Sequence, residues 1–119
     1  MARKFSALAH EAIQDLTRTH PATTADAYDI AAHQFGAFLT APGSGYQDDL
    51  RYFTAPVVAR FVERLTLNKA HPGTIRQKLA ALRAVARFGL RWPSLDRPCL
   101  TTDPTLPIVR PKARRKNQP

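Results

Sequence analysis

Four stretches of this chain repeat apolar residues at intervals of three and four positions, and each is followed by a helix-breaking sequence. This spacing places the apolar side chains on one face of an α-helix, because the helix turns once in about 3.6 residues. The stretches cover residues 5–16, 24–39, 54–65 and 74–90. The sequence therefore predicts an all-α fold, a small four-helix bundle in which each helix buries one face.

Local signals indicate where these helices begin and end. Thr24 and Thr54 are suited to N-caps, and Pro56 falls in a first turn, where its missing N–H costs nothing. The fourth helix is expected to begin near Thr74 and to stop before Pro93. The side chains expected in the core are Phe5, Leu8, Ala9, Ala12, Ile13, Leu16, Tyr28, Ala31, Ala32, Phe35, Phe38, Leu39, Val58, Phe61, Val62, Leu65, Ile75, Leu79, Leu82, Ala86 and Leu90.

The composition changes after Trp92. Six of the ten prolines lie in the last 27 residues, where no helical period can be found. Residues 1–92 are therefore predicted to form one helical domain, and residues 93–119 a flexible, basic, Pro-rich tail or linker outside the core. No strand is expected.

Composition also excludes several classes of protein. The single Cys99 cannot form an internal disulfide or a cysteine metal site, which fits a reducing cytoplasm. The apolar runs are far shorter than the roughly 20 residues that span a bilayer, so no membrane association is expected. The four histidines lack metal-ligand spacing, and no nucleophile pairs with a base. The sequence therefore predicts no catalytic residue, cofactor, metal or small-molecule substrate.

The positive charge is concentrated in the second half of the chain. Residues 1–71 contain seven Lys or Arg and seven acids, whereas residues 72–119 contain eleven Lys or Arg and two acids, which accounts for the whole net charge of +9. A polyanion would be attracted to one end of the molecule, and nucleic acid is the commonest polyanion that proteins bind.

The candidate binding residues lie mainly on the fourth predicted helix. At about 100° per residue, Arg76, Arg83 and Arg87 fall within roughly 40° of one another, with Arg91 just beyond. Their guanidinium groups are suited to bidentate binding of phosphate or a guanine edge. Secondary candidates precede or flank this row, and the basic tail adds non-specific attraction. They are Lys69, Thr74, Gln77, Lys78, Lys112, Arg114, Arg115 and Lys116.

Other interpretations stay open on these residues alone. Charged side chains on a helix are usually a solvated face, but residues 72–94 contain no acid that could form stabilising pairs with the arginines. A helical protein-interaction module, whose basic tail docks on an acidic partner, is the main alternative to double-stranded DNA binding. Single-stranded RNA binding would favour exposed aromatic residues among the basic ones, and the fourth helix offers only Phe88.

The four segments in order resemble the N-terminal core-binding (SAM-like) domain of tyrosine recombinases of the phage-integrase type. The second helix has Thr24, Tyr28 and Phe35 at the family's spacing, and the third begins after Thr54. The most specific match is the run HPGTIRQKLAALR at residues 71–83, followed by a Pro-rich stretch that resembles the linker to a catalytic domain. The resemblance covers roughly residues 3–116.

The resemblance implies a domain that forms half of a clamp on duplex DNA, with the second and fourth helices near the major groove. It implies a role in site-specific recombination or integration, other recombinase subunits as partners on DNA, and a cytoplasmic location with the bacterial nucleoid. The family's catalytic Arg, Lys, His-x-x-Arg and Tyr pattern is not found in residues 1–119. This chain is therefore expected to be an excised or truncated binding domain without activity of its own.

Two positions depart from the family pattern. Asp26 and Asp29 stand on the second helix where basic residues are common, which puts its contact with the groove in doubt. Val57 replaces a frequent acidic residue of the third helix, a change that concerns helix capping more than binding.

Overall fold

A computed structural model describes residues 4–91, 100 and 102–108, together with the backbone of residues 93–94 and 97–98. Its helices are α1 (Phe5–Leu16), α2 (Ala22–Thr40), α3 (Ala55–Leu67) and α4 (Pro72–Arg91), with a short 3-10 turn, η1, at Leu50–Tyr52. The predicted all-α, four-helix bundle is thereby confirmed. No helix among the described residues is long and apolar enough to cross a membrane.

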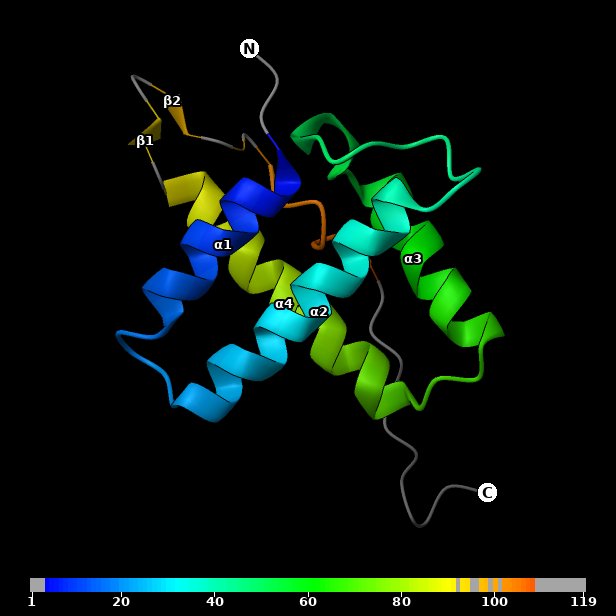
Figure 1. The fold of residues 1–119 in the computed structure, drawn as a ribbon, viewed down its shortest axis with the longest axis horizontal. Helices are drawn as coiled ribbons and strands as arrows, with labels where there is room; N and C mark the ends of the chain where they lie inside the picture. Colours follow the sequence, from blue (N-terminus) through cyan, green and yellow to red (C-terminus); the bar gives the residue numbers. More distant parts are fainter. Residues whose placement is uncertain (1–3, 92, 95–96, 99, 101, 109–119) are drawn as a thin grey trace.

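The helices α2 and α4 cross near the centre of the molecule, with α1 on one side of the crossing and α3 on the other (Figure 1). Both α1 and α2 pack on α4, and α1 also packs on α2. The centre of the core is a group of aromatic rings from three helices and the loop before α3. The Phe5 ring lies 5.0 Å from the rings of Phe35 and Phe53, and Phe61 lies 5.2 Å from Phe35. Their edge-to-face arrangement is the one aromatic pairs favour.

The apolar face of α4 is wider than its sequence period predicts. Ile75, Leu79, Leu82 and Ala86 are buried as expected, and Leu90 is half-buried. The structure also buries four residues that were not expected in the core. They are Ala81, Val85, Phe88 and Gly89. Helices α1 and α2 pack on one flank of α4 while α3 contacts another, so about half of its circumference is covered.

Two predicted helix starts are corrected by the structure. Helix α2 begins at Ala22, so Thr24 lies inside its first turn instead of capping it. Helix α4 begins at Pro72, two residues before Thr74, and the His71 imidazole Nδ1 accepts a hydrogen bond of 3.0 Å from the Gly73 N–H. Proline is favoured at the first helical position because its φ is already helical and it lacks the N–H that would be unpaired there. Thr54 occupies the N-cap position of α3 as predicted, but its side chain makes no capping hydrogen bond.

The segment after α4 is not the external linker that was predicted. Leu100 is 8% exposed and belongs to the core, and Thr105 is fully buried. The Leu100 N–H donates to the Gly89 carbonyl over 3.1 Å. A Cβ at position 89 would come within 2.8 Å of the Leu100 side chain, so glycine permits this close approach. The boundary at residue 92 is therefore wrong, because Leu100, Thr105 and Ile108 pack against the helical core.

Two very short strands precede this segment, although no strand was predicted. Strands β1 (Pro93–Ser94) and β2 (Arg97–Pro98) pair antiparallel, with Pro93 opposite Pro98. They form the small hairpin beyond the end of α4 in Figure 1. Strands of two residues carry too little alternation for a sequence pattern to reveal them. Residues 109–119 lie outside the described part of the chain.

Candidate nucleic-acid interface

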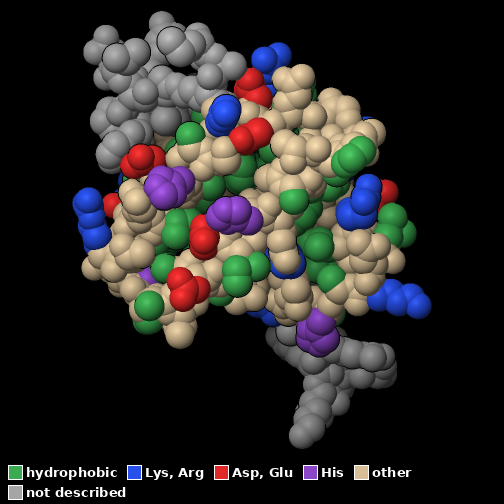
Figure 2. Space-filling view, in the orientation of Figure 1, with side chains coloured by type: hydrophobic (Ala, Val, Ile, Leu, Met, Phe, Trp, Pro, Cys, Tyr) green, Lys and Arg blue, Asp and Glu red, His purple; other side chains and the backbone are tan. Residues whose placement is uncertain are grey.

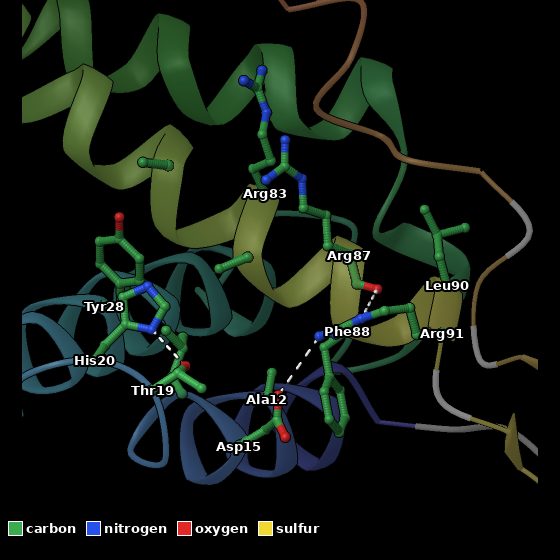
Figure 3. A pocket seen from close by; sticks show the side chains of 13 residues that line it. Ala12, Asp15, Thr19, His20, Tyr28, Arg83, Arg87, Phe88, Leu90 and Arg91 are labelled. Atoms are coloured by element: carbon green, nitrogen blue, oxygen red, sulfur yellow. Dashed lines mark hydrogen bonds and ion pairs between the residues drawn. The ribbon is translucent and has the colours of Figure 1, made fainter.

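Three arginines, which we call the arginine ridge, occupy the sector of α4 that the rest of the fold leaves open. They are Arg76, Arg83 and Arg87; Arg76 and Arg87 are exposed and Arg83 is half-buried. The side chains of Arg83 and Arg87 extend from α4 in the same direction (Figure 3). The backbone of α4 therefore brings together the residues that the sequence placed in one row.

Arg83 and Arg87 of the arginine ridge line one wall of a groove with a volume of about 690 Å³, and Arg76 lies outside it. The opposite wall comes from the end of α1, the connecting loop and the start of α2, and includes His20 and Tyr28 (Figure 3). The Thr19 hydroxyl lies 2.8 Å from the His20 Nδ1. The small side chains of Ala80 and Ala84 lie on the α4 wall between the arginines and leave room for close approach.

No ridge arginine forms a direct ion pair with an acid of the described chain, and Asp103 reaches Arg83 only through the Thr105 hydroxyl. Ion pairs with N···O distances up to 4.0 Å join His33 with Asp29, Arg51 with Asp49 and Arg91 with Asp15, and none of them includes a ridge arginine. Like charges four positions apart on a helix destabilise it slightly, and a bound polyanion would remove that repulsion.

Arg91 behaves differently from the ridge arginines. Its Nη2 lies 3.6 Å from Asp15 Oδ2 on α1, and its Nε donates to the Arg87 carbonyl over 3.4 Å. Figure 3 shows the side chain turned across the groove towards α1. Arg91 was predicted to contact DNA together with the ridge. In this structure a carboxylate competes for it, although both side chains are exposed enough for water and salt to weaken the pair.

The secondary candidates on α4 do not gather around the ridge. Lys78 donates a hydrogen bond to Gln34 of α2 and so lies on the flank that packs against α2. Thr74 and Gln77 are exposed in the first turns of α4. The helical period places all three on the opposite side of α4 from Arg83. The predicted tail contacts, Lys112, Arg114, Arg115 and Lys116, lie outside the described residues.

Lys69 stands in an unusual backbone conformation between α3 and α4. Its φ of 61° is in the left-handed region, which glycine adopts without strain and lysine does not. The Lys69 N–H donates to the Thr66 carbonyl and the Ala70 N–H to the Leu65 carbonyl, each over 3.0 Å. This is the Schellman pattern that ends a helix, usually with glycine at that position. Lysine therefore occupies a strained backbone position at the end of α3.

The acidic side chains lie mainly on a different part of the surface. Helices α1 and α2 contain four acids and no Lys or Arg, whereas α4 contains five Lys or Arg and no acid. On the face shown in Figure 2, acidic and histidine side chains gather over α1 and α2. The four helices share one core, but their exposed faces differ in sign.

Sequence reasoning missed part of the groove. Tyr28 was expected in the core, but it is half-buried and lines the groove. Asp15 and His20 were not singled out as site residues, and no sequence signal identifies them, because their role depends on how α1 packs against α4. Among the described residues, no group of three or more His, Cys, Asp or Glu is arranged to hold a metal ion.

Comparison with protein-family models, curated proteins and solved structures finds no match for this chain. The resemblance to the core-binding domain of tyrosine recombinases therefore stays a prediction from the residues that carry it.

Proposed function

We propose that this protein binds double-stranded DNA through the arginine ridge of α4, as the core-binding domain of a tyrosine recombinase. One observation carries the proposal of DNA binding. Arg76, Arg83 and Arg87 project from one open sector of a helix that is otherwise largely buried, without a carboxylate in salt-bridge range among the described residues. Guanidinium groups on one face of a helix can each bind a phosphate bidentately.

The groove beside the ridge supports the same interpretation. Its α4 wall carries the ridge arginines Arg83 and Arg87, and its other wall presents the polar groups of His20 and Tyr28. A sugar-phosphate strand entering the groove would meet the donors of Arg83 and Arg87 on one wall. On the other wall it would meet His20, Tyr28 and the Asp15 carboxylate, whose charge is partly offset by Arg91. Asp26 and Asp29 of α2, which lie outside the groove, would repel DNA from their side and so favour an approach to α4.

The assignment to the recombinase family adds the wider role. It is supported by the run at residues 71–83, by the Thr24, Tyr28 and Phe35 spacing, and by a fold of four helices in the expected order. In that role the domain forms part of a clamp on DNA during recombination or integration, beside other recombinase subunits. In that role, catalysis would be carried out by a separate domain.

The decisive experiment compares two pairs of arginines with the same spacing. Arg83→Ala with Arg87→Ala removes two ridge charges, and Arg60→Ala with Arg64→Ala removes two exposed arginines four residues apart on α3. Binding to a labelled generic duplex is measured by fluorescence anisotropy from about 0.05 to 0.3 M salt. Circular dichroism checks that each variant keeps its helices.

With about five phosphates neutralised, log K for the unmodified protein should fall against log salt with a slope of about −4 to −5. The ridge pair should reduce this slope by about two and weaken binding by about 50-fold at 0.1 M salt, and the α3 pair by less than about threefold. Equal losses from both pairs would show that net charge alone draws DNA. No binding by the unmodified protein at low salt would reject the proposal and favour an acidic protein partner.

The recombinase role has its own test. The coding sequence that follows the codon for Pro119 should encode an Arg, a His-x-x-Arg pair and a Tyr in that order. A continuous reading frame without that pattern would remove the family assignment and leave DNA binding to be judged by the affinity measurements alone.

A further inference from the structure

Among the described residues, Arg83 is the one ridge arginine with a side-chain hydrogen bond to a residue outside α4. Its Nε donates a hydrogen bond of 3.4 Å to the hydroxyl of Thr105, a residue 22 positions further along the chain. Thr105 is fully buried, whereas the Arg83 side chain is only half-buried. The guanidinium group is therefore held at its inner nitrogen by a residue that solvent does not reach.

Thr105 is itself fixed by a carboxylate. Asp103 Oδ1 accepts the Thr105 hydroxyl over 2.6 Å and the Thr105 backbone N–H over 2.8 Å. A hydroxyl has one hydrogen to donate, so its donation to Asp103 leaves an oxygen lone pair directed at Arg83. The Asp103 charge also polarises the hydroxyl and makes its oxygen a better acceptor. The hydrogen bonds therefore run in one direction, with Arg83 donating to Thr105 and Thr105 donating to Asp103.

This arrangement leaves the outer part of Arg83 available. With Nε occupied, both terminal Nη groups remain to donate, and these are the donors that bind phosphate or a guanine edge. Arg87, which has the same place one turn further along α4, lacks an equivalent side-chain partner among the described residues. The segment 102–108 therefore orders one particular arginine of the ridge.

We infer that Thr105 is a positioning residue for DNA binding: by holding Arg83 at Nε, it directs the two Nη groups of that arginine outward before DNA arrives. The inference rests on the proposed function. An arginine ordered in advance loses less side-chain entropy when it binds, which increases affinity without any new contact. Docking of segment 102–108 on α4 is then coupled to DNA affinity, since the ordered ridge requires Thr105 in place.

A set of variants isolates this coupling. Thr105→Val removes the hydroxyl and keeps the shape, and Thr105→Ser restores a hydroxyl. Thr102→Val makes the same change at an exposed threonine of the same segment and serves as the matched control. Each is measured for duplex affinity in the unmodified protein and with Arg83→Ala, and thermal unfolding reports any general loss of stability.

Thr105→Val should weaken duplex binding about three- to fivefold in the otherwise unmodified protein, and Thr105→Ser and Thr102→Val by less than about twofold. With Arg83→Ala already present, Thr105→Val should cause no further loss. Equal losses in both backgrounds would overturn the positioning role and leave Thr105 a structural residue. If Arg83→Ala itself leaves affinity unchanged, the proposed function of the ridge fails instead.

A second measurement needs no DNA and so separates the two failures. In nuclear magnetic resonance spectra, the Arg83 Nε–H should exchange slowly with water in the unmodified protein and in Thr105→Ser. It should exchange quickly in Thr105→Val, while the Arg87 Nε–H is the same in all three. An Arg83 Nε–H that exchanges as fast as that of Arg87 in the unmodified protein would overturn the inference, whatever the DNA measurements show.

Discussion

The helices on the two sides of this molecule share a core and differ completely in surface charge. Helices α1 and α2 contain Glu11, Asp15, Asp26 and Asp29 and no Lys or Arg, while α4 contains five basic residues and no acid. Both sides bury apolar stripes in the shared core, and to this packing the charge difference adds the exposed ion pair between Asp15 of α1 and Arg91 of α4. The main consequence of the charge difference is that a polyanion is attracted to the side of α4.

The contrast in surface charge between α2 and α4 also bears on how the acids of α2 fit with DNA binding. The resemblance to recombinases places the second helix near DNA, and Asp26 and Asp29 put that contact in doubt. The Asp29 carboxylate lies 3.2 Å from the His33 imidazole on the same helix, and neither residue lines the groove beside α4. We therefore propose that DNA lies against α4 and the groove beside it, with the exposed face of α2 turned away.

The largest expected effect concerns Leu100, which joins the two sides by packing against Gly89 of α4 close to Leu8 of α1. Leu100→Ala should lower the free energy of unfolding by about 2 kcal/mol, because it removes buried methyl groups from a site that is nearly closed to solvent. Thermal or urea unfolding measures this. Leu106→Ala is the matched control: its side chain is 71% exposed, so its loss should stay below about 0.5 kcal/mol. Equal losses would contradict the burial of Leu100.

Lys69→Gly should change the stability of the protein and its affinity for DNA in opposite directions. Glycine relieves the left-handed backbone at this position, so the free energy of unfolding should rise by about 1 kcal/mol. Duplex binding should weaken by several-fold if the ammonium group meets a phosphate. Unfolding by urea and anisotropy on the same samples report the two quantities. A variant that gains stability and keeps full affinity would remove Lys69 from the interface.

Asp15 is the single acid of α1 that reaches an arginine of α4. Asp15→Asn should release Arg91 and tighten duplex binding by about two- to threefold, because an exposed ion pair is worth at most about 1 kcal/mol. The salt slope should become steeper by less than one. Glu11→Gln, which removes the other acid of α1, is the control for a general change in charge. If it tightens binding as much as Asp15→Asn, the Arg91 contact is irrelevant.

The smallest expected effect is the pH-dependent contribution of Asp49 to stability. Asp49 lies in the turn before α3, outside the acidic and basic helices. The Arg51 backbone N–H, 2.9 Å from Asp49 Oδ1, and the Arg51 guanidinium hold the pKa of Asp49 below its ordinary 3.8. A lowered pKa in the folded state means that this carboxylate stabilises the fold above about pH 4 and loses that effect as the pH falls further.

Asp49→Asn tests this effect. The variant should unfold at a lower temperature than the unmodified protein at about pH 6, and the difference should shrink on acidification to about pH 2.5. A difference that stays constant over this range would assign the effect to packing instead of charge. DNA affinity near neutral pH should not change.

Much of the fold could be predicted because its signals are local. The bounds of α1 match the predicted residues 5–16, since an apolar period and two polar ends specify it. The start of α4 was predicted near Thr74, two residues late, because Asn68 to Gly73 was taken as a turn, whereas Pro72 and the His71 imidazole together make an earlier start possible. The full width of the α4 core face could not be predicted, since a period shows which side is apolar but not how many neighbours cover it.

The site was predictable to a similar extent. The row of Arg76, Arg83 and Arg87 follows from helical spacing alone and is found as expected. The pairing of Arg91 with Asp15 and the anchoring of Arg83 by Thr105 join residues far apart in the chain, and no local pattern encodes them. Residues 100–108 were missed for the same reason, because isolated apolar residues such as Leu100 among prolines show no period.

The sequence by itself determined four helices, a division of charge between the first and second halves, and a line of arginines along the last helix. These features depend on spacing and composition, which act over one or two turns of chain. Only the tertiary structure decided which arginines remain open, which one is anchored and which one faces an acid. Those outcomes depend on distances between separate elements, and such distances are set when the chain buries its apolar surface in one shared core.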